Sequence, residues 1–312
     1  MNHSKPLGNR TVVVTGAARG LGAALACAAA RRGARVALLG HDRPALEEAA
    51  ARLPSTTLAL EADITDLAAL ASAADTVRAR LGPASVVIAN AGIAEGGPFL
   101  SSDPATWRRV VDVNLTGSAY TARAFLPDLM ATAGHFCQVA SLASLGAAPL
   151  MSAYCASKAG VEAFSHSLRA EVAHQGVSVG IAYLNWIDTD MVRDADRYAV
   201  LRELRASMPP PARRVSSAPE VAERIMHSVE RRRTAVYAPP WLRLMQPVRA
   251  AVPPVVMRLS RRRLPRLEAE EPFEPTGLLG AGGEADYAAR VEPLRQLRQT
   301  APNTRHGPET TH

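Results

Sequence analysis

Short apolar runs alternate with amphipathic stretches along the first 240 residues of the chain. The apolar runs predict strands, and the amphipathic stretches between them predict helices. Apolar runs without polar interruptions are typical of parallel strands that are buried on both faces. The pattern therefore predicts an α/β fold, with a doubly wound parallel sheet of about seven strands and helices on both faces. The expected strands cover residues 11–15, 35–39, 57–62, 85–89, 136–141, 177–184 and 235–237.

This alternation ends near Pro239. Residues 231–266 contain ten arginines and no acidic residue, and apolar residues recur at roughly helical spacing from Trp241 to Leu259. From Glu268 onward the chain is rich in Glu, Gly, Pro and Thr and has little periodicity. We therefore predict an α/β domain over residues 1–240, a basic amphipathic arm over 241–266 and a largely disordered tail over 267–312.

The composition narrows the class of protein. Of 312 residues, 47% are hydrophobic and 21% are charged, which is ordinary globular usage. The formal charge is +7, yet the 36 basic residues include only two lysines, Lys5 and Lys158. Basic residues without interleaved aromatic ones do not favour a nucleic-acid partner. The three cysteines show no metal-ligand spacing and predict reduced thiols in a cytoplasmic protein without a bound metal.

A glycine-rich loop separates the first predicted strand from the first predicted helix. Its sequence from Thr15 is TGAARGLG, with glycines at positions 16, 20 and 22. Glycines permit a tight turn and a close approach of the backbone to a pyrophosphate. The start of the following helix supplies free N–H groups and a partial positive charge. The loop is a candidate phosphate cradle, and a glycine turn without a ligand is the alternative interpretation.

The loop resembles the TGxxxGxG motif of the classical short-chain dehydrogenases/reductases. Further motifs of that family follow in the family's order: an aspartate that ends the third strand, Asn-Ala-Gly after the fourth, an asparagine, a serine that ends the fifth and a YxxxK. They are Asp63, Asn90-Ala91-Gly92, Asn114, Ser141 and Tyr154 to Lys158. The resemblance covers roughly residues 8–240, and it implies a Rossmann-like fold, a nicotinamide coenzyme and hydride transfer.

The resemblance also implies which residues bind the coenzyme, and these lie in the loops that follow successive strands. They are Gly16, Arg19, Gly20, Leu21, Gly22, His41, Asp63, Ile64, Asn90, Ala91, Gly92, Tyr154, Lys158, Ile187 and Thr189. One departure concerns the loop after the sixth strand, where Leu184-Asn185 stands in place of the family's Pro-Gly. Because both turn residues of the family are replaced, the resemblance does not predict the path of this loop beside the nicotinamide.

Candidate catalytic chemistry centres on Tyr154 and Lys158, which lie four residues apart at the start of a predicted helix and project from one face. A free tyrosine has a pKa of about 10, and a nearby ammonium group is expected to lower the pKa of Tyr154. Tyr154 would then donate a proton to a carbonyl oxygen or accept one from an alcohol. Ser141 would hydrogen-bond the same oxygen. The resemblance adds that Lys158 contacts the nicotinamide ribose and that Asn114 holds a water in a proton relay.

The end of the second strand bears on the choice of coenzyme. An acidic residue there would bind the ribose 2′-hydroxyl of NAD, but this chain has Gly40. Arg19 resembles the basic residue of NADP-preferring members, and His41 or Arg43 would assist it, because a guanidinium suits a phosphate. The carboxylate of Asp42 is the competing feature. We expect NADP, with NAD less favoured.

The region after the sixth strand points to the substrate. Residues 190–215 are expected to form a mobile lid whose apolar wall faces a lipophilic substrate. The candidates for this wall are Met191, Tyr198, Val200, Leu201 and Leu204, and Trp186 lines the pocket or belongs to the core. Residues 241–263 are expected to contact a membrane surface peripherally, or to pack on the fold or on a dimer partner.

These features predict an NADP-dependent oxidoreductase that acts on a carbonyl or secondary alcohol of a lipophilic small molecule, with a role in lipid metabolism. The resemblance implies a homo-oligomer. One alternative is a 3-oxoacyl-thioester reductase, whose acidic carrier an arginine-rich surface would attract. The other is a non-catalytic dinucleotide sensor docked on a membrane, which an intact set of Ser141, Tyr154 and Lys158 disfavours.

Overall fold

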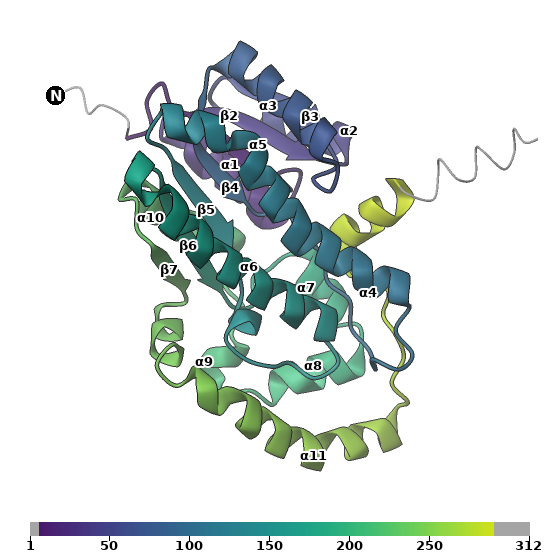
Figure 1. The fold of residues 1–312 in the computed structure, drawn as a ribbon. Coiled ribbons are helices and arrows are strands. Elements are labelled where there is room, and N and C mark those ends of the chain that lie inside the picture. The colour runs from purple at the N-terminus through teal and green to yellow at the C-terminus, as the bar shows by residue number, and fades with distance from the viewer. Residues whose placement is uncertain (1–5, 290–312) are drawn as a thin grey trace, which may run out of the picture.

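The computed structural model describes residues 6–289, and its centre is a seven-stranded parallel sheet (Figure 1). The strand order is β3-β2-β1-β4-β5-β6-β7, and each neighbouring pair is parallel. This arrangement confirms the predicted fold class. The strands are β1 (Thr11–Thr15), β2 (Arg35–Gly40), β3 (Thr57–Glu61), β4 (Ala84–Ala89), β5 (His135–Val139), β6 (Ser178–Leu184) and β7 (Ala235–Ala238).

Helices cover both faces of the sheet. Side chains of α1, α2 and α10 pack on one face, and those of α3, α5 and α6 pack on the other. The main helices are α1 (Gly20–Arg31), α2 (Arg43–Ala51), α3 (Leu67–Leu81), α4 (Pro104–Val111), α5 (Gly117–Ala131), α6 (Ser152–Val172) and α10 (Ala218–Glu230). Shorter helices follow β6, namely α7 (Asp190–Ala195), α8 (Ala199–Ala206) and α9 (Pro210–Arg213).

The central strands supply both cores, because successive side chains point to opposite faces. In β1, Val12 and Val14 enter one core and Val13 enters the other. All three valines are fully buried, and burying each such side chain contributes roughly 1.5–3 kcal/mol. The continuous apolar runs in the sequence therefore reflect strands that are covered on both sides.

The carboxyl ends of all strands lie at one edge of the sheet, because every strand runs in the same direction. From β1 the chain builds one side of the sheet with β2 and β3 and the other side with β4 to β7, so the strand order reverses between β1 and β4. Open α/β sheets bind ligands in the crevice at such a switch point. β3 ends at Glu61 and β5 at Val139, so Asp63 and Ser141 lie two residues beyond the strands that they were expected to end.

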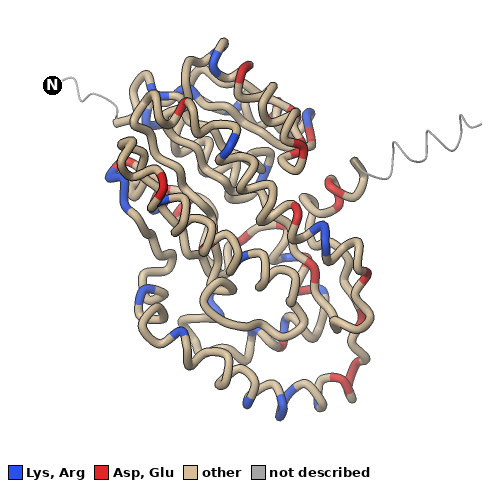
Figure 2. The backbone as a smooth tube through the Cα atoms, viewed as in Figure 1, with Lys and Arg blue, Asp and Glu red and all other residues tan. Residues whose placement is uncertain are grey.

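Beyond β7 the chain forms η4 (Pro240–Met245), η5 (Arg249–Ala251) and the long helix α11 (Val252–Glu270), which crosses one end of the molecule (Figure 1). Leu242 is buried, and Arg249 pairs with Glu162 of α6 at 2.8 and 2.9 Å. In contrast, α11 has no buried residue. Basic residues follow one another along α11, and acidic residues gather where it ends (Figure 2).

The expected disordered tail differs from the structure over residues 274–289, which return to the edge of the sheet and pack on the loop that follows β4. Thr276 N donates to Gly96 O at 2.8 Å, and Leu279 N donates to Ala94 O at 2.9 Å. These contacts join residues about 180 positions apart, so local periodicity gives no sign of them. Residues 290–312 of the predicted tail lie outside the described residues, and the domain division at residues 240 and 266 stays a prediction. Between residues 6 and 289, no helix is long and apolar enough to cross a bilayer.

Candidate active site

The glycine loop forms one wall of a cleft at the switch point. Gly16 and Gly20 have positive φ angles of 63° and 56°, which side-chain-bearing residues rarely adopt. A Cβ atom on Gly22 would lie 2.0 Å from Gly16 O, and one on Gly16 would lie 2.8 Å from Ala91 Cα. Since α1 begins at Gly20, the free N–H groups of its first turn also belong to this loop. The cradle therefore fits the pyrophosphate of a dinucleotide.

Asn90 joins the loop after β4 to the end of β1. Its Nδ2 donates to Thr15 O at 3.0 Å and to Gly16 O at 3.3 Å. In return, Thr15 Oγ1 accepts hydrogen bonds from Asn90 N and Ala91 N, each at 3.1 Å. These bonds hold the two loops together across the point where the strand order reverses.

Ser141, Tyr154 and Lys158 meet on the opposite wall. Ser141 caps the short helix η2 (Leu142–Ser144), and its hydroxyl hydrogen-bonds Tyr154. Because α6 begins at Ser152, Tyr154 and Lys158 lie in its first two turns, and Lys158 Nζ is 5.6 Å from the centroid of the Tyr154 ring. Lys158 Nζ also donates to Val139 O at 3.3 Å. The structure thus brings the predicted trio together.

Burial dominates the protonation of this trio. It raises the pKa of Tyr154, although the hydrogen bond with Ser141 acts in the opposite direction. Burial also lowers the pKa of Lys158 to about 8. The expectation that the ammonium group lowers the pKa of Tyr154 is therefore wrong for this state, because the cost of burying the phenolate is larger. Tyr154 is protonated at neutral pH, which is the form that donates a proton to a carbonyl oxygen.

Asn114 lies just behind the trio, in the π-helical turn η1 (Asp112–Thr116) between α4 and α5. Its Oδ1 accepts from Ile93 N, and its Nδ2 donates to Ile93 O and to Ser157 Oγ, all at 2.9 Å. The side chain therefore ties the loop after β4 to α6. Single π-helical turns occur frequently at functional sites. The role of Asn114 in a proton relay stays a prediction.

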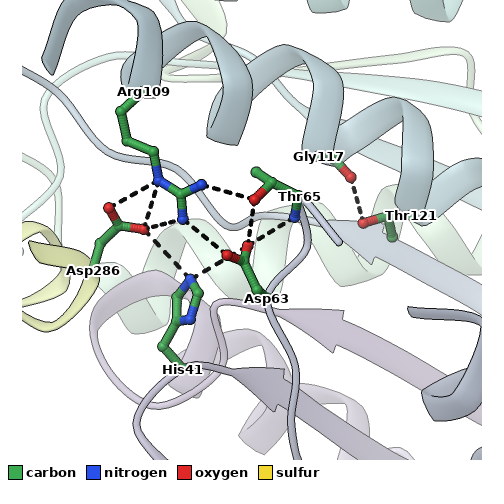
Figure 3. Close-up of polar contacts among 7 residues, drawn as sticks. All are labelled: His41, Asp63, Thr65, Arg109, Gly117, Thr121 and Asp286. Carbon is green, nitrogen blue, oxygen red and sulfur yellow. Dashed lines mark hydrogen bonds and ion pairs between the residues drawn. The ribbon is translucent and has the colours of Figure 1, made fainter. Parts of the chain in front are cut away.

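His41, Asp63, Arg109 and Asp286 form a cluster of charged side chains (Figure 3), and two of its members, His41 and Asp286, line the cleft. Asp63 accepts from Thr65 N and Thr65 Oγ1, both at 2.8 Å, and from Arg109 Nη2 at 3.2 Å. Burial raises the pKa of Asp63, but these bonds and the charges of Arg109 and His41 together hold it below its ordinary value. His41 Nε2 lies 3.7 Å from Asp63 and 3.4 Å from Asp286. The hydrogen bond with Asp286 is the largest effect that raises the pKa of His41.

Arg19 forms an ion pair with Asp42, whose side chain also caps α2 by accepting from Ala45 N. The other end of the Arg19 guanidinium donates to Ala281 O at 3.0 Å. Arg43 instead pairs with Glu47 one helical turn away and is largely exposed. Of the basic residues considered for coenzyme choice, Arg19 and His41 line the cleft.

The loop after β6 borders the cleft near the trio. Asn185, at the position of the family's glycine, donates from its backbone to Ala238 O at 3.1 Å and from Nδ2 to Ala212 O at 2.8 Å. Thr189 precedes α7, and its methyl group would lie 3.2 Å from a Cβ on Gly20. Ile187 and Thr189 line the cleft, as expected.

An apolar cluster adjoins Tyr154 beside α7 and α8. Of the predicted lid residues, Met191, Tyr198, Val200 and Leu201 belong to it, together with Ala94 and Leu279. Trp186 packs under Arg205, whose guanidinium carbon lies 5.7 Å from the ring centroid, and does not line the cleft.

Nearly all the predicted site residues line this one cleft, whose volume is about 260 Å³. Asp63 and Asn114 are the exceptions, but the neighbours of Asp63 in the chain, Ala62 and Ile64, line the cleft, and so does Ile93, which hydrogen-bonds Asn114. Sequence reasoning missed the part that Arg109 and the C-terminal segment play. The cleft residues from that segment are Leu279, Gly282, Ala285 and Asp286. Asp286 stands among small residues in a stretch without periodicity, which offers no local signal of a site.

Comparisons with known proteins agree with this geometry. The sequence model of the short chain dehydrogenases matches residues 10–198. The dehydrogenase/reductase SDR family member 7B of Bos taurus is 31% identical over 271 residues, which cover 82% of this chain and 81% of that protein. The cis-4-hydroxycyclohexanecarboxylate dehydrogenase of Sinomonas cyclohexanicum is 34% identical over 223 residues, or 69% of this chain and 87% of that protein.

The fold also resembles solved structures. A short chain dehydrogenase/reductase from Burkholderia phymatum, crystallised in complex with NAD, superposes with a TM-score of 0.69. That match covers 77% of this chain and 93% of the other, at 24% sequence identity. A short-chain type dehydrogenase/reductase from Mycobacterium marinum superposes with a TM-score of 0.67 over 74% of this chain and 94% of the other.

Proposed function

Because the chain belongs to the short-chain dehydrogenase family, we propose that it is an NADP-dependent oxidoreductase with Tyr154 as the acid/base. Family membership makes it an NAD(P)-dependent enzyme that acts on CH–OH groups. The observation that carries the proposal is the hydrogen-bonded Ser141 and Tyr154 beside Lys158, in the cleft that the glycine cradle closes from the other side.

Each residue of the trio has a distinct task. When bound, the nicotinamide supplies or accepts the hydride. Tyr154, protonated at neutral pH, donates its proton to the carbonyl oxygen of the substrate, or accepts one from an alcohol in the reverse direction. Ser141 orients that oxygen through a hydrogen bond. A charged Lys158 favours the phenolate that proton donation leaves behind.

NADP is the coenzyme that we favour over NAD. Gly40 at the end of β2 has no carboxylate for a ribose 2′-hydroxyl, while Arg19 and His41 line the cleft beside it. A guanidinium suits bidentate contact with the 2′-phosphate. The pairing of Arg19 with Asp42 is the feature that would favour NAD instead, because it neutralises this guanidinium.

We further propose a lipophilic carbonyl or secondary alcohol as the substrate, which would place the enzyme in lipid metabolism. The apolar cluster around Tyr154, with Met191, Tyr198 and Leu201, supports a substrate of this class. The exposed arginines of α11 support a second proposal, peripheral contact with an anionic membrane. A 3-oxoacyl-thioester reductase remains the alternative. Cytoplasmic location and homo-oligomerisation stay predictions.

A turnover assay tests the proposal directly. We expect the purified enzyme to oxidise NADPH in the presence of lipophilic ketones, followed by the loss of NADPH absorbance. Tyr154→Phe should lower kcat by a factor of about 10²–10⁴, the usual contribution of a general acid, and should leave NADPH binding almost unchanged. Tyr120→Phe is the matched control, because Tyr120 is a partly buried residue of α5 that packs against the core and does not line the cleft.

Wild-type turnover by Tyr154→Phe would remove its acid role. Tight NADPH binding without turnover of any ketone or alcohol would favour the dinucleotide sensor.

A further inference from the structure

The C-terminal segment lies across the cleft in which the coenzyme is proposed to bind. We call residues 274–289 the strap. Its first part runs antiparallel to the loop after β4, with a bridge between Leu278 and Glu95. The side chain of Leu279 is buried in the apolar cluster beside Tyr154. The second part, from residue 280, is helical and lies near α4 (Figure 1).

Asp286 fastens the helical part of the strap to the body of the protein. Its carboxylate is 1% exposed and accepts from Arg109 Nη2 at 2.6 Å and from Arg109 Nε at 3.0 Å (Figure 3). His41 Nε2 lies 3.4 Å from the same carboxylate. Such charge-assisted pairs are the stronger hydrogen bonds of proteins. Asp286 therefore holds the strap in place, and we call its contacts with Arg109 and His41 the latch.

The latch uses groups at the end of the cleft where the adenosine half of a dinucleotide would lie. His41 follows β2, and Asp63, which shares Arg109 with Asp286, follows β3. Five residues before Asp286 in the strap, Ala281 O accepts a hydrogen bond from Arg19, the residue proposed to bind the 2′-phosphate. The strap thus engages two polar side chains that line this end of the cleft, Arg19 and His41, and also Arg109, which lies outside its lining.

The space that the strap leaves is small. The cleft measures about 260 Å³, whereas pockets for drug-sized ligands usually measure about 300–1,000 Å³. A dinucleotide is larger than a drug-sized ligand. The strap also engages Arg19 through Ala281 O and His41 through Asp286, so the adenosine half would have to take these side chains from it.

We propose that the strap and the adenosine half of the coenzyme bind in competition, with Asp286 as the residue that sets how tightly the strap holds. The inference rests on the proposed coenzyme site. Binding of the coenzyme releases Asp286 from Arg109 and His41, and the same movement withdraws Leu279 from the apolar cluster beside Tyr154. Coenzyme entry thereby opens the substrate side of the cleft as well.

The affinity of the full-length protein for NADPH tests this competition. Asp286→Asn keeps the size of the side chain and removes the charge that holds Arg109. We expect it to bind NADPH roughly tenfold more tightly, the scale on which loss of a charge-assisted hydrogen bond shifts an equilibrium. NADPH fluorescence gives the Kd. Asp75→Asn is the control, since Asp75 is an exposed residue of α3 that pairs with Arg78 far from the cleft.

Limited proteolysis of the unmodified protein gives a second readout that depends on no variant. We expect saturating NADPH to accelerate cleavage by a glutamyl endopeptidase after Glu284, which lies within the strap. Protection of Glu284 by NADPH, or weaker binding by Asp286→Asn, would overturn the competition and make the strap a wall of the occupied site. Equal affinities of wild type and Asp286→Asn would also overturn it while the coenzyme assignment stands. Failure of both proteins to bind any nicotinamide dinucleotide would overturn the coenzyme assignment and the competition with it.

Discussion

At the scale of single residues, the two ends of the cleft differ in what determines the charge of their side chains. Near the trio, burial is the largest effect on both ionisable groups, so Lys158 has a pKa of about 8 and Tyr154 keeps its proton. At the other end, around His41, the charged groups have partners: Arg109 is shared by Asp63 and Asp286. One end is therefore suited to proton transfer at neutral pH, and the other is suited to binding.

Arg19 is the residue at which coenzyme choice is most directly tested. We expect Arg19→Ala to weaken NADPH binding about 10- to 100-fold, the range for a lost hydrogen bond to a charged group, and to change NADH binding about twofold or less. Kd values for both dinucleotides, measured by fluorescence titration, check this. Arg43→Ala serves as the control, because Arg43 pairs with Glu47 on the exposed side of α2. An equal loss for both dinucleotides would contradict the NADP assignment.

At the scale of elements, periodicity predicted the strands and helices well because β1, β4 and β5 are covered on both faces. The ends of elements were harder to predict. β5 stops at Val139 because the backbone then turns into η2, whose first N–H groups Ser141 caps. The arm, whose apolar residues recur at roughly helical spacing in the sequence, is divided into η4, η5 and α11. Pro253 and Pro254 fall in the first turn of α11, where a proline needs no N–H partner.

Helix α11 is the element through which membrane contact is testable. Replacing Arg258, Arg261 and Arg262 with glutamine should weaken co-sedimentation with phosphatidylserine-containing vesicles roughly 100-fold, since each basic residue near such a surface contributes about 1 kcal/mol. The triple variant Arg43, Arg52 and Arg108 to glutamine removes equal charge from other exposed helices and should bind as wild type. If both triple variants lose binding equally, net charge rather than α11 is responsible.

At the scale of the whole molecule, sequence motifs predicted where most of the cleft lies, because parallel strands place all of its loops at one edge. They did not predict what covers it. The strap reaches the cleft through long-range pairs such as Arg109 with Asp286, 177 positions apart, and no local pattern reports such a pair. Local sequence also could not predict the direction in which the pKa of Tyr154 is shifted, because that depends on how deeply the folded protein buries the phenol.

The pH dependence of folding is a property of the whole molecule with one identifiable source. His135 at the start of β5 is 3% exposed, and burial, with Arg232 and Arg169 nearby, lowers its pKa to about 3. Below a pH of about 6.5, His135 binds a proton in the unfolded chain but stays neutral in the folded protein. It therefore makes the free energy of unfolding fall as the pH falls towards 3.

Urea unfolding at pH 7 and at pH 5 measures this effect. Between pH 7 and pH 5, the free energy of unfolding should fall by about 1–2 kcal/mol more in the wild type than in His135→Asn. The variant is less stable at both pH values, because the smaller side chain leaves a cavity. The same loss in both proteins would assign the effect to other groups.

Lysine is so rare in this chain that the burial of Lys158 has a practical consequence. Amine-directed reagents attack the uncharged form, and a pKa of about 8 leaves part of the Lys158 population uncharged at neutral pH, while its 4% exposure denies reagents access. Lys5 is the other lysine side chain. The extent of acylation at position 158, read by peptide mass, therefore records how often the interior of the cleft meets solvent.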